Sequence, residues 1–106
     1  MKEETGMAYI TCSSIEEAMK MGEILVKDRI AACANIIPKM ISLYIWKNEL
    51  EKSEEAVLIT KILKKNYTKL ETRVKELHSY TVPCILYYPS SAGYPPYIQW
   101  MIENSA

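Results

Sequence analysis

Cys12, Cys84 and the single histidine, His78, are the side chains of this chain best suited to bind a metal ion. Cys12 ends a short alternating stretch typical of a strand, and Cys84 begins the last such stretch, soon after His78. If the first and last strands are antiparallel neighbours, we expect all three side chains at one edge of the sheet. Two thiolates and an imidazole favour Cu(I) or zinc over calcium or magnesium, because soft ligands select soft ions.

Each of these residues also has a purely structural interpretation. Cysteine is among the most buried residue types, so Cys12 and Cys84 could pack as small hydrophobic side chains. A histidine at the end of a helix, as we expect for His78, can interact with the helix dipole. We expect Cys33, in the run Ala-Ala-Cys-Ala, to be a small buried thiol without chemistry.

Composition argues against several classes of function. The 13 basic and 13 acidic residues balance, and no long block of like charge marks a surface for nucleic acid or an anionic membrane. No apolar run approaches the length of a transmembrane helix. Gly-rich phosphate loops, H-E-x-x-H and nucleophile elbows are absent from the sequence, so we expect neither an enzyme nor an organic cofactor. Three cysteines without close pairing fit a reducing compartment, which predicts a cytoplasmic protein.

The longest patterned segment, residues 34–61, predicts one oversized hairpin. Its outgoing arm places large apolar side chains on both faces, in the run Ile41-Ser42-Leu43-Tyr44-Ile45-Trp46. Asn48 lies at the expected tip, where positive φ is needed. Fully extended, residues 34–47 would span about 45 Å, whereas a domain of this size has a radius of gyration of about 13 Å. The arm must therefore bend, for example at Pro38, or overhang the subunit and meet a partner chain.

The remaining pattern predicts a single domain of residues 1–106, with residues 1–6 as a flexible leader. Ser14 and Glu17 form the capping box of a first helix, and Asn66 is a good N-cap for a second. The first helix is expected to bury one apolar face, and Gly22 within it suggests that a strand passes close by. That face comprises Ile15, Ala18, Met19, Gly22, Leu25 and Val26.

Taken in order, the pattern is strand, helix, strand, strand, helix, strand and a short C-terminal helix over residues 97–103. The last strand is expected over residues 84–88. Two βαβ-type halves on one antiparallel sheet, with both main helices on one face, make an α+β fold of the ferredoxin-like split βαβ type. The long hairpin and the C-terminal helix are additions to that arrangement.

Several separated motifs, in matching order over about residues 7–103, resemble those of the CutA divalent-cation tolerance family. They are Ala31-Ala32-Cys33-Ala34-Asn35 followed by Ile37-Pro38, Leu43-Tyr44-x-Trp46-Lys47-x-x-Leu50-Glu51, Thr11-Cys12, Leu77-His78-x-Tyr80-x-Val82-Pro83 and Tyr97-x-x-Trp100. The resemblance implies a ferredoxin-like subunit in a tight homotrimer, cytoplasmic in most members, with divalent metal ions, copper above all, as ligands.

The resemblance also bears on individual residues. Relatives read His-Pro-Tyr-Glu-x-Pro-Glu where this chain reads His78-Ser79-Tyr80-Thr81-Val82-Pro83-Cys84, so both acidic positions are absent. A first-strand cysteine implicated in copper binding in some relatives aligns with Ile10, on the same face as Cys12. The chain lacks that cysteine and the last glutamate of the relatives' motif, but the thiols of Cys12 and Cys84 lie close to these two positions in the sequence.

Four hairpin residues are candidates for a subunit interface or pocket: Trp46, Tyr44, Glu51 and Lys61. Trp46 suits an interface anchor, because rigid aromatic side chains dominate interface cores. Lys61 matches a lysine of the relatives and could pair with an acidic group at a subunit boundary, or it could be an exposed lysine at a strand edge.

Three functions remain open. The first is a trimeric protein that acts in the response to metal ions and binds copper or another divalent ion weakly. The second is a trimeric small-molecule sensor, because the ferredoxin-like trimer resembles that of the PII signalling proteins. The third is a structural or interaction scaffold without catalytic activity.

Overall fold

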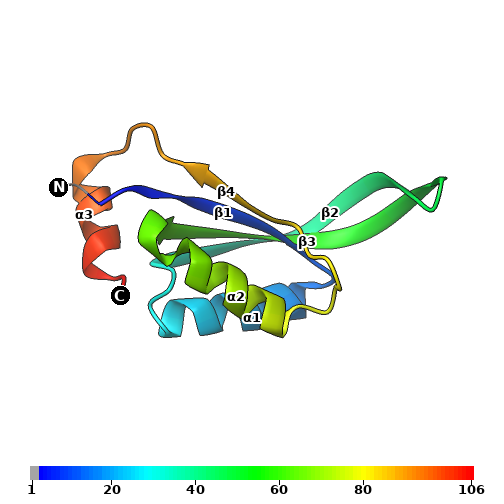
Figure 1. The fold of residues 1–106 in the computed structure, drawn as a ribbon, viewed down its shortest axis with the longest axis horizontal. Coiled ribbons are helices and arrows are strands. Elements are labelled where there is room, and N and C mark those ends of the chain that lie inside the picture. Colours follow the sequence, from blue (N-terminus) through cyan, green and yellow to red (C-terminus); the bar gives the residue numbers. More distant parts are fainter. Residues whose placement is uncertain (1–2) are drawn as a thin grey trace.

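The computed structural model describes residues 3–106, in which four strands form one antiparallel sheet in the order β2-β3-β1-β4. Helices α1 and α2 cover one face of this sheet, and α3 lies at the end remote from the hairpin (Figure 1). The ferredoxin-like α+β prediction is thereby confirmed. The elements are β1 (Thr5–Cys12), α1 (Ile15–Lys27), β2 (Cys33–Trp46), β3 (Glu49–Leu63), the 3-10 turn η1 (Lys64–Asn66), α2 (Tyr67–Leu77), β4 (Ile85–Pro89) and α3 (Pro95–Glu103).

The core lies between the sheet and the two main helices. Strand alternation turns Ala8, Ile10 and Cys12 of β1 toward the helices, and all three are fully buried. Helix α2 packs Leu70 and Val74 against them, within the apolar stripe expected from its sequence. None of the helices in residues 3–106 has both the length and the apolar character needed to cross a bilayer.

The buried face of α1 differs from the one expected. Ala18, Gly22 and Leu25 are buried as predicted, but they are joined by Met21, which is 1% exposed. Ile15, Met19 and Val26, predicted to be in the core, are exposed. Met19 and Val26 instead line a shallow groove of about 310 Å³ with Ala34 and Ile36 of β2. The face is shifted because β2, the edge strand, leaves this side of α1 uncovered.

Gly22 lies where a strand passes close to the helix, as predicted. A Cβ atom there would be 3.3 Å from both the Ala34 Cβ and a Leu58 methyl group. Glycine thus allows α1 to approach β2 and β3 closely.

The hairpin of β2 and β3 extends well beyond the body (Figure 1), and the molecule measures 48 × 26 × 22 Å. Lys47 and Asn48 form its two-residue turn, with φ angles of 51° and 66°, which match the right-handed twist of the strands. A bulge between Ile37 and Met40 accommodates Pro38, which cannot donate to the ladder. The sequence left a bent arm and an overhanging arm open, and the structure shows both: the bulge interrupts the arm near Pro38, and the hairpin overhangs the body (Figure 1). Its exposed apolar side chains are Ile41, Leu43, Ile45, Trp46 and Leu50.

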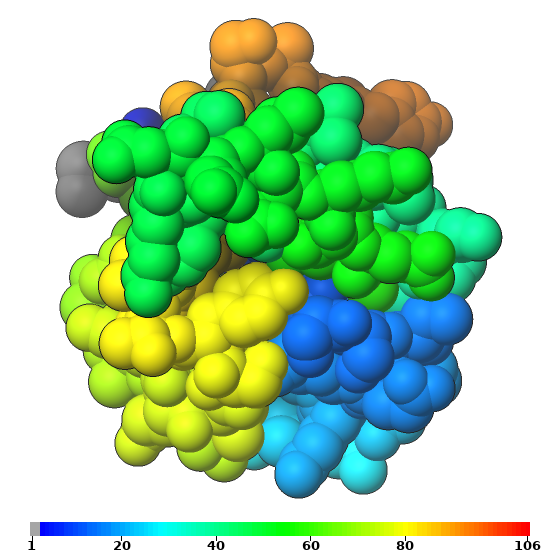
Figure 2. All heavy atoms as spheres, turned by 90° about the vertical axis from the view of Figure 1, so that its right-hand side faces the viewer, coloured from blue at the N-terminus to red at the C-terminus, as the bar shows by residue number. Residues whose placement is uncertain are grey.

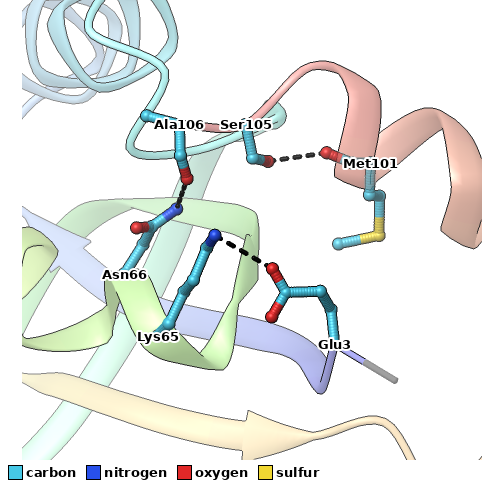
Figure 3. Close-up of polar contacts among 6 residues, drawn as sticks. All are labelled: Glu3, Lys65, Asn66, Met101, Ser105 and Ala106. Atoms are coloured by element: carbon cyan, nitrogen blue, oxygen red, sulfur yellow. Dashed lines mark hydrogen bonds and ion pairs between the residues drawn. The ribbon is translucent and has the colours of Figure 1, made fainter. Parts of the chain in front are cut away.

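The prediction of a flexible leader over residues 1–6 has to be corrected. Strand β1 already begins at Thr5, and Gly6 is paired on both sides, with Ile62 and Pro89, so the backbone is fixed by the sheet. Before it, Glu3 forms an ion pair with Lys65 at 2.9 Å (Figure 3). Residues 1–2 of the predicted leader lie outside the described residues.

Asn66 does not cap α2 with its side chain, which also differs from the prediction. An N-cap side chain acts from an extended backbone, whereas Asn66 follows the 3-10 turn and has φ −94° and ψ 0°. Its side-chain amide instead donates to the carbonyl oxygen of Ala106 at 3.2 Å (Figure 3). The Ala106 N–H in turn donates to the Arg29 carbonyl at 2.9 Å, so the last residues are held against the body.

We predict that Gly6→Ala lowers the free energy of unfolding by about 1–3 kcal/mol, the usual cost of overpacking. A Cβ atom at this position would lie 2.5 Å from the Tyr88 carbonyl oxygen and 2.6 Å from the Tyr87 ring, and the backbone oxygen cannot move aside cheaply. Denaturant unfolding at fixed protein concentration measures the change. The control is Gly93→Ala, where the new methyl group meets the flexible Ile98 side chain at 2.7 Å. Equal losses for the two variants would contradict this explanation.

Candidate functional site

The end of β1, the first turn of α1 and the residue after α2 bring three possible ligands together. The Cys12 thiol, the Glu17 carboxylate and the His78 imidazole each offer one ligand atom, and these atoms lie within 4.8 Å of one another. We call this group the Cys12–Glu17–His78 cluster. It unites two of the three predicted metal residues, Cys12 and His78, but its third member is Glu17 rather than Cys84.

Both ring nitrogens of His78 are already hydrogen-bonded. The Tyr80 N–H donates to Nδ1 at 3.0 Å, and Nε2 lies 2.7 Å from the Thr11 carbonyl oxygen. A carbonyl can only accept, so Nε2 carries the proton and Nδ1 does not. The ring therefore joins β1 to the chain after α2 as a neutral imidazole. His78 has extended backbone angles, and its N–H still bonds the Val74 carbonyl, which places it at the end of α2 as expected.

The Glu17 carboxylate holds the start of α1 against the chain after α2. One oxygen accepts from the N–H and hydroxyl of Ser13, at 2.8 and 3.0 Å, and the other accepts from the Ser79 N–H at 2.8 Å. Burial alone would raise the pKa of Glu17, but these hydrogen bonds favour the charged form and hold the pKa below its ordinary value.

The predicted capping box is present in part. The Ser14 hydroxyl accepts from the Glu17 N–H at 3.1 Å, as expected for an N-cap. The glutamate, however, reaches back to the N–H of Ser13 rather than that of Ser14. It therefore extends past the helix end, toward Ser79.

The Cys12 thiol is the most deeply buried donor of the cluster. It is fully inaccessible to solvent, and burial, assisted by the negative charges of Glu17 and Glu55, raises its pKa to about 12. At neutral pH it is therefore a thiol, which is also what the structural interpretation of this residue expected. A metal ion that binds the sulfur must displace its proton, so affinity would rise with pH.

Cys84 lies on the other face of the sheet. Ile85, the first residue of β4, pairs with Ile10, so continuing the register places Cys84 beside Thr11. Successive β1 residues point to opposite faces, so Thr11 and the neighbouring Cys84 face away from Cys12, and the sheet separates the two cysteines. Burial and Glu55 raise the pKa of Cys84, while a side-chain hydrogen bond with Thr11 opposes the rise. The sequence predicts the correct edge of the sheet for both cysteines, but strand order alone does not say which face each side chain occupies.

The donor types of the cluster fit a zinc or copper ion, for which thiolate, imidazole and carboxylate are all common ligands. The arrangement, however, is closed. Every described polar atom of Glu17 and His78 that could bind an ion already holds a hydrogen bond, and Cys12 holds a proton. An ion would have to replace these interactions, which predicts modest affinity.

The four candidate interface residues all belong to the hairpin strands. Trp46 and Glu51 lie near the tip, where Trp46 is 60% exposed, and the Tyr44 hydroxyl shares a hydrogen bond with Ser53 at 2.7 Å. Lys61 lies at the opposite end of β3, where its ammonium stands 5.3 Å from the centre of the Tyr97 ring of α3. Within the described chain, Lys61 thus makes a cation–π contact, which neither sequence interpretation foresaw.

Two further residues were missed by the sequence analysis. Glu17 was assigned only to helix capping, although a carboxylate at a helix start near Cys12 was a visible signal. Tyr80 belongs to a family motif but was given no role. Its hydroxyl donates to the Glu55 carboxylate at 2.7 Å, a contact between residues 25 positions apart that no local pattern reveals.

We predict that Glu17→Gln lowers the free energy of unfolding by about 1 kcal/mol at neutral pH, the value for partly exposed hydrogen bonds to a charged group. Because the folded pKa is lowered, the stabilisation is fully present above the ordinary glutamate pKa of about 4.3 and is lost as the pH falls through the folded value. In unfolding curves, the difference in stability between parent and variant should therefore be largest at about pH 7 and should shrink as the pH falls below the ordinary glutamate pKa.

The matched control is Glu16→Gln, which removes a carboxylate from the same helical turn and is exposed. A loss of stability as large as that of Glu17→Gln would mean that the helix dipole, rather than the hydrogen bonds to Ser13 and Ser79, is responsible.

Comparison with known proteins agrees with this architecture. Residues 6–104 match the family model of the CutA1 divalent ion tolerance protein. The divalent-cation tolerance protein CutA of Thermus thermophilus is 41% identical over 99 residues, covering 93% of this chain and 96% of that protein. Its Archaeoglobus fulgidus counterpart is 35% identical, with 91% and 93% covered.

The solved structures agree as well. A structure of the divalent cation tolerance protein CutA1 from Thermus thermophilus superposes with a TM-score of 0.93, at 38% identity over 96% of this chain and 99% of that chain. The sheet order, the long hairpin and the C-terminal helix are thus accompanied by sequence identity along nearly the whole length. The chain belongs to the CutA1 divalent ion tolerance protein family.

Proposed function

We propose that this protein acts in the cytoplasm in the response to metal ions, as a homotrimer that binds copper or another divalent metal ion weakly. The observation that carries the metal part of the proposal is the Cys12–Glu17–His78 cluster, whose ligand atoms converge within 4.8 Å. The family name connects relatives with divalent-cation tolerance and names no enzyme, so we propose a role without catalysis. The free state of the cysteines supports a reducing compartment.

The donor set favours soft or borderline ions. A thiolate and an imidazole select copper or zinc, whereas calcium and magnesium prefer sites built of oxygen ligands. Modest affinity follows from the closed geometry of the cluster, because binding exchanges hydrogen bonds and a thiol proton for metal–ligand bonds.

The hairpin supports assembly into an oligomer. Leu43, Ile45 and Leu50 are 66–70% exposed, and Trp46 stands among them on a ribbon that no helix of the described chain covers. Apolar side chains on both faces of a projecting ribbon are stabilised when another subunit buries them. The trimeric state itself comes from the family resemblance.

The alternative of a trimeric small-molecule sensor has one observation in its favour. A cleft of about 820 Å³ lies between the start of β1 and α3, large enough for a small organic ligand. A thermal-shift panel of divalent ions, Cu(I), nucleotides and carboxylic acids separates the candidates, because a ligand that binds only the folded protein raises the apparent stability. A scaffold without ligands would respond to none of them.

We predict that Cys12→Ser weakens Cu(I) binding at least tenfold, because serine oxygen is a poor ligand for a soft ion. Competition against a chromophoric Cu(I) chelator measures the affinity. Cys84→Ser is the matched control: it removes a thiol of the same chain from the opposite face of the sheet and should leave the affinity unchanged. If the Cys12→Ser, Cys84→Ser double variant competes as well as the parent, neither cysteine takes part in a copper site.

We predict that Trp46→Ala weakens assembly more than Trp100→Ala. Trp46 lies at the end of the projecting ribbon, whereas Trp100 belongs to α3 and stacks on Tyr97 of the same chain at 5.5 Å. Analytical ultracentrifugation over a micromolar dilution series measures dissociation of both variants. Equal effects would argue against the hairpin as the main interface, and a well-folded monomer of the parent protein would refute the trimer.

A further inference from the structure

We propose that residues 78–80 couple the Cys12–Glu17–His78 cluster to the root of the hairpin, so that an ion bound at the cluster loosens the hairpin. We call residues 78–80 the connecting segment. This inference rests on the proposed function, because it assigns regulation of the assembly element to the proposed metal site. The connecting segment lies outside regular secondary structure, after α2 and before β4. Its position therefore depends on the side-chain contacts at its two ends.

At the first end, two hydrogen bonds attach the segment to β1 and α1, and a third holds Tyr80 to the cluster residue His78. His78 Nε2 bonds the Thr11 carbonyl at 2.7 Å, the Ser79 N–H donates to Glu17 at 2.8 Å, and the Tyr80 N–H donates to His78 Nδ1 at 3.0 Å. An ion that takes either His78 nitrogen, or the Glu17 oxygen facing Ser79, must break at least one of these bonds. An ion held by His78, or by the Glu17 oxygen that faces Ser79, therefore releases part of the segment.

At the second end, Tyr80 attaches the segment to the hairpin. Its hydroxyl donates to the Glu55 carboxylate at 2.7 Å. Glu55 is paired with Met40, directly beyond the bulge at which the hairpin leaves the body of the sheet. The Tyr9 hydroxyl donates to the Met40 sulfur at 3.3 Å, so β1 also contacts this point. Tyr80 therefore helps to fix the direction of the ribbon where it begins to project.

The two ends are in direct contact through their rings. The centroids of the His78 and Tyr80 rings lie 4.7 Å apart, with the planes tilted by 45°. Viewed from the hairpin side, the yellow atoms around residue 80 lie beside the blue atoms of the start of α1, and the green hairpin lies above both (Figure 2). A rotation of the imidazole toward an ion would push or release the phenol ring. His78 and Tyr80 thus form a side-chain path from the cluster to Glu55 of the hairpin.

The coupling must be reciprocal. If an ion at the cluster destabilises the Tyr80–Glu55 contact, then fixing the hairpin in an assembly must lower the affinity for the ion by the same factor. Metal loading and oligomer stability would then respond to each other through a segment with an attached and a detached state.

The experiment measures backbone hydrogen–deuterium exchange in residues 53–57 and 38–42, with two independent changes at the cluster: saturation with Cu(I), and Glu17→Gln. Each is made in the parent, in Tyr80→Phe and in Tyr44→Phe. The Tyr44→Phe control removes a phenol hydrogen bond within the hairpin, to Ser53, which does not involve the connecting segment. Cu(I) affinity is measured on the same samples.

We expect both changes to raise exchange in these residues several-fold in the parent and in Tyr44→Phe. In Tyr80→Phe exchange should already be raised, and neither change should add to it. If Tyr80→Phe does not fold, Glu55→Gln tests the same contact from the hairpin side.

Three results would each contradict a different part of the proposal. If Cu(I) does not bind the parent, the metal part of the proposed function fails, and the Glu17→Gln arm alone decides whether the cluster is coupled to the hairpin. If Cu(I) binds but exchange does not change, the site stands and the coupling is wrong. If Tyr80→Phe responds as the parent does, coupling does not pass through Tyr80.

Discussion

The structure depends on the double pairing of one long strand. Strand β3 runs from Glu49 to Leu63, and its inner part, from Ala56 onward, pairs with β1 in the body of the sheet. Its outer part pairs with β2 alone and forms the projecting hairpin. The same strand thus supplies the centre of the core and one arm of the projecting ribbon. Displacing it would affect both.

The boundary between these two parts is also where the candidate site lies. Cys12, the last residue of β1, pairs with Ala56, and Glu55 is the next residue along β3. The start of α1 and the chain after α2 arrive at the same edge, because both follow the geometry of a split βαβ fold. The proximity of cluster and hairpin root is therefore a consequence of the topology. Two neighbouring residues of β3 therefore contact different parts of the molecule: Ala56 pairs with Cys12 of the cluster, and Glu55 pairs with Met40 of the hairpin.

The polar groups at this edge are satisfied by one another. Glu17, His78 and the serines beside them close the gap between three elements with charge-assisted or short hydrogen bonds. Burial keeps the Cys12 sulfur protonated in the middle of this network. An ion bound here would therefore compete with these hydrogen bonds for the same atoms, unlike an ion at a preformed site with an open position.

The sequence by itself determined the order of elements, the fold class and the overhang of the hairpin, because these follow from strand alternation, helix periodicity and turn residues that act locally. It also located Cys12 and His78 at one edge of the sheet. Only the tertiary structure decided which face each side chain occupies, since the register turns Cys84 away from Cys12. It likewise decided which α1 side chains are buried, and that Glu17 and Tyr80 bridge segments far apart in the chain. Such contacts depend on how elements pack together, which no periodicity within one element encodes.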